Sequence, residues 1–219
     1  MRADEVVERF RRTGALLEGH FVLTSGLHST QYLQCALVLQ HPAEAEAFGR
    51  AIAEQFRNVG VETVVAPAIG GIIIGWEVAR ALSVRSIWTE REEGKMTLRR
   101  GFIVRPGERV LVVEDVITTG GSTRETCDAL RSAGALVVGA ASIIDRSGGR
   151  ADVGVPRVAL ATLEVPAVSP TDCSLCDAGG SGRTGVRAGW LLSPGSWGLR
   201  LSRPTCSPHA IRRSRLRSF

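Results

Sequence analysis

Residues 110–123 read Val-Leu-Val-Val-Glu-Asp-Val-Ile-Thr-Thr-Gly-Gly-Ser-Thr, and three kinds of local structure follow one another within them. The apolar run 110–113 is short and rich in β-branched residues, which is typical of a buried strand. Two carboxylates and a turn of threonines and glycines come next. Ser122 or Thr123 can then cap a helix, with Glu125 in the first turn, where the helix dipole favours an acid. The stretch therefore predicts a strand, a turn and a helix in immediate succession.

The turn in this stretch has the chemistry of a phosphate-binding loop. Gly120 and Gly121 lack Cβ atoms, so the backbone can turn sharply and bring its N–H groups close to an anion. These N–H groups, those of the helix start and the neighbouring hydroxyls would together hold a phosphate monoester. The hydroxyls belong to Thr118, Thr119, Ser122 and Thr123. Glu114 and Asp115 suit vicinal sugar hydroxyls or a hard cation such as Mg²⁺. The alternative is an ordinary strand–turn–helix connection whose acids are merely solvated.

Strands and helices alternate along most of the chain. The order predicts βαβ units with right-handed crossovers and a parallel sheet, in which ligands bind at the carboxyl ends of the strands. The predicted strands are 62–66, 86–89, 110–116, 136–144 and 157–163, and the predicted helical segments are 4–17, 42–59, 74–83 and 122–133. The first of these helices is expected to end near Gly14. Residues 19–34 alternate in polarity around a Ser-Gly pair and predict a small hairpin. Residues 90–101 are charged and without clear periodicity, and we expect a loop there.

The composition is that of a globular protein with one ordinary domain. A chain of 219 residues can build a substantial core, and 44% of them are hydrophobic and 22% charged. No apolar run approaches the ~20 residues that cross a bilayer, and the N-terminus resembles an acidic amphipathic helix more than a signal peptide. The five cysteines, an odd number without framework-like spacing, indicate a reducing cytoplasm. We therefore expect a cytoplasmic protein without a membrane partner.

The positive charge of the chain is concentrated at its C-terminal end. A net charge of +5 would suggest nucleic acid as a partner, but residues 178–219 hold eight arginines and no acid. Residues 1–177 then hold 19 basic and 22 acidic groups, a net charge of −3, and we expect no nucleic-acid partner. Residues 179–219 are rich in Gly, Arg, Ser and Pro and have no periodicity, so we expect a poorly ordered tail. A tail created by a shifted reading frame is the alternative.

Residues 110–123 as a whole resemble the phosphoribosyl-pyrophosphate (PRPP) motif of the type I phosphoribosyltransferases. The resemblance covers roughly residues 4–178 and implies that family's α/β fold: one domain over 1–178, a mostly parallel twisted sheet flanked by helices, and a small N-terminal hood mainly within 1–40. Mg²⁺ would arrive with PRPP and lie near Glu114 and Asp115 without a direct protein ligand. By resemblance, the PRPP-binding residues of the motif are Glu114, Asp115, Val116, Ile117, Thr118, Thr119, Gly120, Gly121 and Ser122.

A second loop carries the resemblance further. Residues 66–71, Ala-Pro-Ala-Ile-Gly-Gly, follow a predicted strand directly and resemble the family's diphosphate loop. The resemblance implies that the backbone at Ala68, Gly70 and Gly71 faces the leaving diphosphate. A turn that combines Pro67 with a glycine pair suits the strained backbone often found in phosphate-binding loops.

The charged segment 90–101 resembles the mobile catalytic loop of the orotate phosphoribosyltransferases, and the alternative is an exposed surface loop. It contains Lys95, the single lysine of a chain with 26 arginines. By resemblance, Arg91 and Lys95 cover the diphosphate from the neighbouring subunit of a homodimer with shared active sites, and both residues also bind PRPP. Together with Asp115 they are the implied catalytic residues. Related loops often carry a further lysine and a histidine, where this chain has Glu92 and Thr97.

Two features indicate which molecule would accept the phosphoribosyl group. The hairpin at 19–34 resembles the hood of the orotate enzymes, although Thr24 stands where many relatives have a lysine. Its Ser25, Gly26 and Tyr32 either contact the ligand or serve packing and turns. By resemblance, Arg146 recognises the carboxylate of orotate with Thr118 beside it, because a guanidinium can donate two parallel hydrogen bonds to a carboxylate. The alternative for Arg146 is a surface ion pair with Asp145.

Cys173 and Cys176 have the spacing of a metal-binding pair. A structural zinc site takes four ligands, and the remaining cysteines, Cys35, Cys127 and Cys206, do not form a second pair. We therefore expect no zinc and no metal ion held directly by the protein.

The resemblance implies a phosphoribosyl transfer from PRPP to orotate, which yields orotidine 5′-monophosphate and diphosphate and is a step in the synthesis of UMP. A purine phosphoribosyltransferase is one alternative, and the hood hairpin argues against it. A PRPP-sensing regulator without catalysis is another. Such regulators usually add a DNA- or RNA-binding element, and the sequence shows no helix-turn-helix pattern.

Overall fold

The computed structural model describes residues 1–23, 26–165, 167–177 and 183–184. The chain divides into two compact units. The first consists of Met1–Leu17 and Leu33–Glu164, and the second of Glu18–Tyr32 and Val165–Phe219. The predicted poorly ordered tail at 179–219 lies outside the described residues, apart from residues 183–184.

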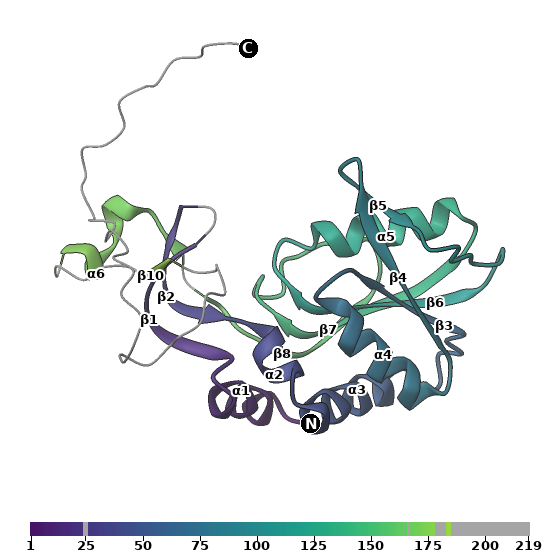
Figure 1. Cartoon of the computed structure of the whole chain (residues 1–219), viewed down its shortest axis with the longest axis horizontal. Helices are drawn as coiled ribbons and strands as arrows, with labels where there is room; N and C mark the ends of the chain where they lie inside the picture. The colour runs from purple at the N-terminus through teal and green to yellow at the C-terminus, as the bar shows by residue number, and fades with distance from the viewer. Residues whose placement is uncertain (24–25, 166, 178–182, 185–219) are drawn as a thin grey trace, which may run out of the picture. The chain divides into compact units, whose positions relative to one another are not determined.

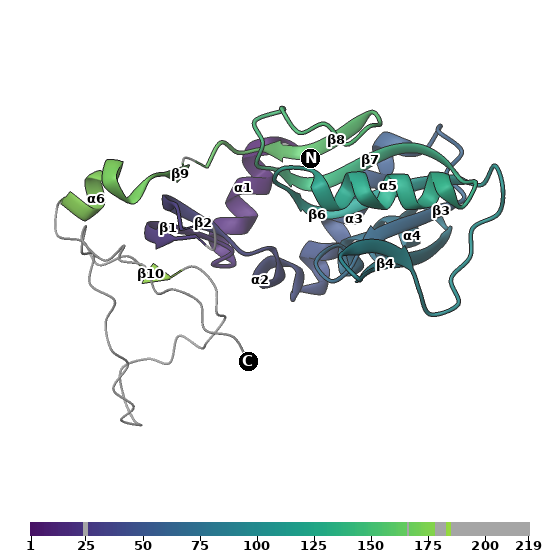
Figure 2. The ribbon, with the colours of Figure 1, turned by 90° about the horizontal axis from the view of Figure 1, so that it is seen from above.

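A six-stranded sheet forms the centre of the first unit (Figure 1). Its order is β5-β4-β3-β6-β7-β8. The neighbours from β4 to β8 are parallel, and β5 pairs antiparallel with β4 at the edge. Figure 2 shows β8, β7, β6 and β3 side by side. The strands are β3 (Thr63–Pro67), β4 (Arg85–Glu92), β5 (Lys95–Leu98), β6 (Arg109–Ile117), β7 (Leu136–Asp145) and β8 (Arg157–Thr162). The predicted mostly parallel α/β sheet is thereby confirmed.

Helices cover both faces of this sheet. Because side chains alternate between the faces of a strand, Val64, Leu111 and Val113 join the core under α3 and α4, whereas Val65 and Val112 join the core under α5. Figure 1 shows α5 above the strands and α3 and α4 below them. The helices of this unit are α1 (Ala3–Arg12), α2 (Cys35–Leu39), α3 (Pro42–Phe56), α4 (Gly71–Leu82) and α5 (Gly121–Ser132).

The helix boundaries agree with one prediction and correct another. The first helix ends at Arg12, close to its expected end near Gly14, which takes a positive φ of 69° before the chain enters a strand at Leu16. Helix α5 has Gly120 as its N-cap, with a φ of 82°, and no side chain caps it. Thr123 instead donates its hydroxyl to Glu114, and Glu125 lies beyond the first turn, so the predicted caps and dipole contact are wrong.

The second unit contains a four-stranded sheet of order β10-β1-β2-β9. Strands β1 (Leu16–Val22) and β2 (His28–Leu33) form the predicted hairpin. The sequence did not predict the C-terminal elements that join it: β9 (Ala167–Val168) pairs with β2 and β10 (Arg183–Thr184) with β1. A short 3-10 helix (Pro170–Asp172) and α6 (Ser174–Asp177) complete the unit.

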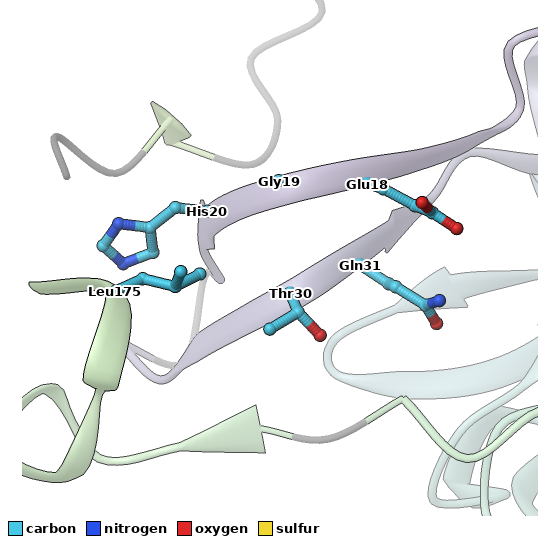
Figure 3. A pocket seen from close by; sticks show the side chains of 6 residues that line it. All are labelled: Glu18, Gly19, His20, Thr30, Gln31 and Leu175. Atoms are coloured by element: carbon cyan, nitrogen blue, oxygen red, sulfur yellow. The ribbon is translucent and has the colours of Figure 1, made fainter. Parts of the chain in front are cut away.

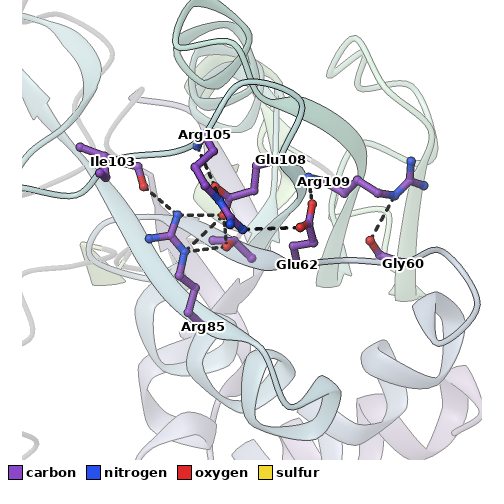
Figure 4. A network of polar contacts seen from close by, with 8 residues as sticks. Gly60, Glu62, Arg85, Ile103, Arg105, Glu108 and Arg109 are labelled. Atoms are coloured by element: carbon purple, nitrogen blue, oxygen red, sulfur yellow. Dashed lines mark hydrogen bonds and ion pairs between the residues drawn. The ribbon is translucent and has the colours of Figure 1, made fainter.

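A buried acid ties together the amino ends of three parallel strands (Figure 4). The Glu108 side chain, 1% exposed, accepts hydrogen bonds from Arg85 Nη2 (2.8 Å), from the Thr63 hydroxyl and from the backbone N–H of Arg105 (2.7 Å). Burial alone raises the pKa of Glu108, but these hydrogen bonds outweigh it and lower the pKa to about 2. The network lies at the end of the sheet opposite to the loops that carry the predicted chemistry.

The described residues include no helix that is both long and apolar enough to span a bilayer.

Candidate active site

The two carboxylates of the motif stand near the C-terminal end of β6 and are largely withdrawn from water. Burial raises the pKa of Glu114 to about 7, the hydroxyl of Thr123 opposes the shift, and the neighbouring Asp115 adds to it. Burial also raises the pKa of Asp115, against hydrogen bonds from the Val116 backbone N–H (2.9 Å) and the Cys35 thiol. Both acids therefore gain from a ligand that offers hydroxyls or positive charge.

The turn after β6 presents polar groups to solvent. Thr118, Thr119 and Gly121 are exposed, Ser122 is half-buried, and the N–H groups of the α5 N-terminus open into the same turn. Of the two glycines in the turn, only Gly120 is required on steric grounds. A Cβ on Gly120 would lie 2.9 Å from Val153 Cγ1, and the φ of this residue is left-handed, whereas a Cβ on Gly121 would meet no atom closer than 3.7 Å.

The turn after β3 lies directly against these acids. A Cβ on Gly70 would stand 2.8 Å from Asp115 Oδ1 and 2.9 Å from Oδ2, and a Cβ on Gly71 would stand 2.9 Å from the Val113 carbonyl oxygen. The Ala68 N–H donates to the Thr89 carbonyl at 2.8 Å, and the Ala68–Ile69 peptide bond is cis. The structure therefore brings the predicted diphosphate loop and the predicted PRPP motif together.

Arg146 follows β7 and reaches the same group of loops. Its backbone N–H donates to the Ile117 carbonyl at 2.8 Å, which places it beside Thr118. Its buried Nε has no hydrogen-bond partner among the described residues, an exception to the rule that buried donors are paired. The alternative of an ion pair with Asp145 is wrong, because Asp145 is buried and bound to Arg157 Nη1 at 2.8 Å. Arg146 is thus left for another partner.

Cys35 is a neighbour of this site that the sequence did not indicate. Its thiol is buried at the start of α2, close enough to Asp115 to donate to it. Burial and the Asp115 charge raise the thiol pKa well above its usual value, and the positive charge of Arg146 opposes them. Cys35 is therefore a neutral thiol near both charged groups, and a lone cysteine carries no sequence pattern that marks it.

The segment 90–101 is a hairpin and not the predicted loop. Strands β4 and β5 pair from Thr89–Leu98 to Glu92–Lys95 and are joined by Glu93 and Gly94, both with positive φ, as in a type I′ turn. Alternation failed to predict it because both faces of the hairpin carry charged residues. Lys95 is exposed at the start of β5. Arg91 donates to the Gly94 carbonyl and to Glu125 of α5 (2.9 Å) within the same chain.

The predicted hood residues are only partly described. Thr24 and Ser25 lie outside the described residues, Gly26 takes a φ of 81° in the turn, and Tyr32 stacks against Phe21 with ring centroids 5.6 Å apart. The packing role of Tyr32 is therefore observed, and a ligand role for Ser25, Gly26 or Tyr32 stays a prediction.

The cysteine pair has partners that the sequence argument missed. Within the second unit, His20, His28, Cys173 and Cys176 bring four potential ligand atoms within 4.8 Å of one another. The expected shortage of ligands is therefore wrong, because that argument counted cysteines alone. Two histidines eight residues apart, together with the Cys-x-x-Cys pair, were the signal that could have found the cluster.

Comparisons with known proteins connect this geometry to a family. Residues 36–165 match the family model of the phosphoribosyl transferase domain. Orotate phosphoribosyltransferase of Pelotomaculum thermopropionicum is 56% identical over 179 residues, which cover 82% of this chain and 94% of that protein. The chain belongs to the orotate phosphoribosyltransferase family. The family member of Thermotoga maritima is 49% identical over 195 residues, which cover 89% of this chain and all of that protein.

Solved structures agree with membership of the orotate phosphoribosyltransferase family. The crystal structure of orotate phosphoribosyltransferase from Aeropyrum pernix has a TM-score of 0.60 and 29% sequence identity, and the match covers 73% of this chain and 94% of that one. The predicted family and its type of fold are confirmed. The matched residues 36–165 include the turns after β3 and β6, the β4–β5 hairpin and Arg146, whereas His20, His28, Cys173 and Cys176 lie outside them.

Proposed function

We infer that the protein is an orotate phosphoribosyltransferase, which transfers the 5-phosphoribosyl group from PRPP to orotate in the synthesis of UMP. The products are orotidine 5′-monophosphate and diphosphate. The observation that carries this inference is the 56% identity to an orotate phosphoribosyltransferase along 94% of its length. The half-buried acids, the exposed hydroxyl turn and the Arg146 Nε, which has no partner among the described residues, suit such a reaction.

The donor is held by the β6–α5 connection. The 5-phosphate accepts hydrogen bonds from the N–H groups of the α5 N-terminus and the hydroxyls of Thr118, Thr119 and Ser122. Glu114 and Asp115 accept hydrogen bonds from the ribose hydroxyls, which add to the hydrogen bonds that these half-buried acids already accept from Thr123 and from the Val116 backbone. Because Gly70 has no side chain, the diphosphate loop can approach Asp115 closely.

Mg²⁺ fits this site as a companion of PRPP. Two adjacent carboxyl groups with raised pKa values favour a nearby positive charge, and oxygen is the donor that Mg²⁺ prefers. When bound there, Mg²⁺ would supply positive charge that offsets the negative charge of the diphosphate. Glu114 and Asp115 orient the ribose and would lie near the ion without being its direct ligands.

Arg146 is the residue best placed to bind orotate. Its guanidinium combines a fixed positive charge with a buried Nε donor that has no partner among the residues described. A carboxylate takes two parallel hydrogen bonds from such a group. Orotate is already ionised, so the acceptor nitrogen needs no strong general base, and Arg146 with Thr118 serves to position the ring.

The leaving diphosphate is stabilised by Lys95 and Arg91. Departure of diphosphate leaves an oxocarbenium-like sugar, so the catalysis rests on positioning and on electrostatic stabilisation. We propose that the β4–β5 hairpin acts on the site of the other subunit of a homodimer and that its closure excludes water. For Arg91 to reach a diphosphate it has to exchange its contacts with Glu125 and Gly94.

One assay tests the function. The purified full chain is incubated with PRPP, Mg²⁺ and one of orotate, adenine or xanthine, and diphosphate release is measured. Orotate alone should release diphosphate and yield orotidine 5′-monophosphate. Turnover with adenine or xanthine would support a purine enzyme, and binding of PRPP without turnover of any base would support a regulator.

A further inference from the structure

Four side chains from two distant parts of the sequence converge in the second unit. His20 lies on β1 and His28 on β2, whereas Cys173 directly precedes α6 and Cys176 lies within it. Their donor atoms are close: His20 Nε2 lies 2.9 Å from His28 Nδ1, 3.5 Å from Cys173 Sγ and 3.6 Å from Cys176 Sγ. Cys176 Sγ lies 3.2 Å from His28 Nδ1. Neither cysteine is in a disulfide.

These distances fit one tetrahedral ion. With Zn–N bonds of about 2.0 Å, Zn–S bonds of about 2.3 Å and tetrahedral angles, ligand atoms stand about 3.3 Å apart for two nitrogens and about 3.5 Å for nitrogen and sulfur. The three observed nitrogen–sulfur separations of 3.2–3.6 Å lie close to the second value, and the nitrogen–nitrogen separation of 2.9 Å is somewhat shorter than the first. All four ligand atoms lie within 4.8 Å of one another. One proton can form only one of these hydrogen bonds at a time, whereas one metal ion can be coordinated by all four atoms at once.

We propose that His20, His28, Cys173 and Cys176 bind one structural Zn²⁺ ion. Two thiolates and two imidazoles form a closed ligand set for zinc, with no position left for a reacting water. A two-iron cluster does not fit these distances. In such a cluster the two histidines bind one iron and the two cysteines the other, so each cysteine would stand farther from each histidine than the 3.2–3.6 Å observed here. The site lies outside the residues 36–165 that match the phosphoribosyl transferase domain.

The second unit has little hydrophobic core of its own among the described residues, so a metal ion could stabilise it. Neither hydrophobic core cluster includes a described residue of Glu18–Tyr32 or Val165–Phe219. Its C-terminal strands, β9 and β10, are two residues long and pair through two residues each. Small units without a sufficient core are often held by a metal. Zinc would join the hairpin to a segment about 150 residues further along the chain.

The local backbone prepares the ligands. The Cys176 N–H donates to the Cys173 carbonyl at 2.9 Å, which turns both thiols toward one side, and Ser169 caps the 3-10 helix before them. An open hollow of about 480 Å³ lies in this unit and is lined by Glu18, Gly19, His20, Thr30, Gln31 and Leu175. Figure 3 shows the side chains of His20 and Leu175 beside each other there. This hollow gives an ion a route to His20. Binding releases one proton from each thiol, as both must become thiolates.

The test is the metal content of the full chain, purified in reducing buffer without chelator. Wild type should hold about one zinc per chain, and Cys176→Ser or His28→Ala should lower that content at least tenfold. The matched controls, Cys127→Ala and His41→Ala, change a cysteine and a histidine outside the cluster and should keep the zinc. No substrate is needed, so the result is independent of the enzymatic activity.

A second measurement uses wild type alone, in case the variants do not fold. After removal of zinc with a chelator, added Co²⁺ should give the visible absorption of a tetrahedral site with a thiolate charge-transfer band. Chelation should also speed proteolysis within residues 18–32 relative to the first unit. Zinc-free wild type, a Cys173–Cys176 disulfide in the reduced preparation, iron in place of zinc, or a Co²⁺ spectrum without thiolate ligation would each overturn the proposal.

Discussion

Gly70 leaves space that the carboxylate of Asp115 fills, since a Cβ on residue 70 would lie 2.8 Å from Asp115 Oδ1. Gly70 lies in the turn after β3, and Asp115 lies near the C-terminal end of β6. Their close approach joins the proposed diphosphate loop to the proposed ribose-binding acids, so that a change in one displaces the other.

Gly70→Ala should therefore impair the reaction more than the fold. The new methyl group has to push Asp115 away, and misplacement of a positioning group by about 1 Å can reduce the rate on the order of 10²-fold. We expect a loss of that order in kcat/KM for PRPP in a steady-state assay. Ile103→Ala, at a residue that is 71% exposed and outside the candidate site, is the control and should keep most activity. Equal activity of the two variants would contradict this role of Gly70.

Gly120→Ala should destabilise the protein, and Gly121→Ala should not. Alanine in a left-handed conformation costs about 1–2 kcal/mol, and the contact with Val153 Cγ1 at 2.9 Å adds to it. We expect a loss of about 2–3 kcal/mol in the free energy of unfolding for Gly120→Ala, measured by urea denaturation. Gly121 has an ordinary φ and space for a methyl group, so Gly121→Ala is the matched control. An equal loss of unfolding free energy in both variants would show that the left-handed φ of Gly120 does not cause the loss.

The ionisation of Glu114 should make both stability and ligand binding depend on pH. Its folded pKa of about 7 lies above the ordinary value of 4.5, so its contribution to stability is complete below pH 4.5 and is lost as the pH rises through about 7. The melting temperature of the free protein should fall over that range, and Glu114→Gln should flatten the decline.

The same carboxyl should release a proton when PRPP and Mg²⁺ bind near pH 7, because the ligands favour its charged form. Calorimetric titrations in two buffers of different ionisation enthalpy measure the number of protons released. Glu114→Gln should release fewer protons than wild type, and identical numbers would exclude Glu114 as their source.

Glu108 should protect the fold at neutral pH and lose this role in acid. Its pKa of about 2 lies below the ordinary 4.5, so the stability it contributes is present above pH 4.5 and is lost as the pH falls toward 2. The shift corresponds to about 3 kcal/mol. Glu108→Gln should unfold in less urea than wild type at pH 7, with a smaller difference at pH 3. Glu54→Gln, at an exposed pair with Arg57, should change stability by less than about 0.5 kcal/mol at either pH.

Lys95→Ala should lower kcat on the order of 10²-fold or more, as for other contacts made in the transition state. Arg50→Ala, at an exposed cation on α3 that pairs with Glu46, is the control and should remain active. If the hairpin acts on the neighbouring subunit, mixing Lys95→Ala chains with Asp115→Asn chains should restore part of the activity. Mixtures no more active than their components would argue against shared sites, and normal turnover of Lys95→Ala would remove it from the mechanism.

The sequence by itself predicted five of the six strands in the sheet of the first unit and the position of the candidate donor site. A strand, a turn and a helix in succession depend on local periodicity, so residues 110–123 predicted β6 and α5 to within a few residues. The charged hairpin of β4 and β5 escaped prediction because neither of its faces is uniformly apolar, and pairing between strands, not periodicity, defines it.

Tertiary structure alone decided which groups meet. Arg157, at the start of β8, pairs with Asp145 at the end of β7, and the buried Nε of Arg146 has no hydrogen-bond partner among the described residues. In the same way, His20 and His28 meet Cys173 and Cys176 only because C-terminal strands return to the hairpin. Contacts between residues about 150 positions apart produce no periodic pattern in a single sequence, because they form only when the chain folds into its tertiary structure.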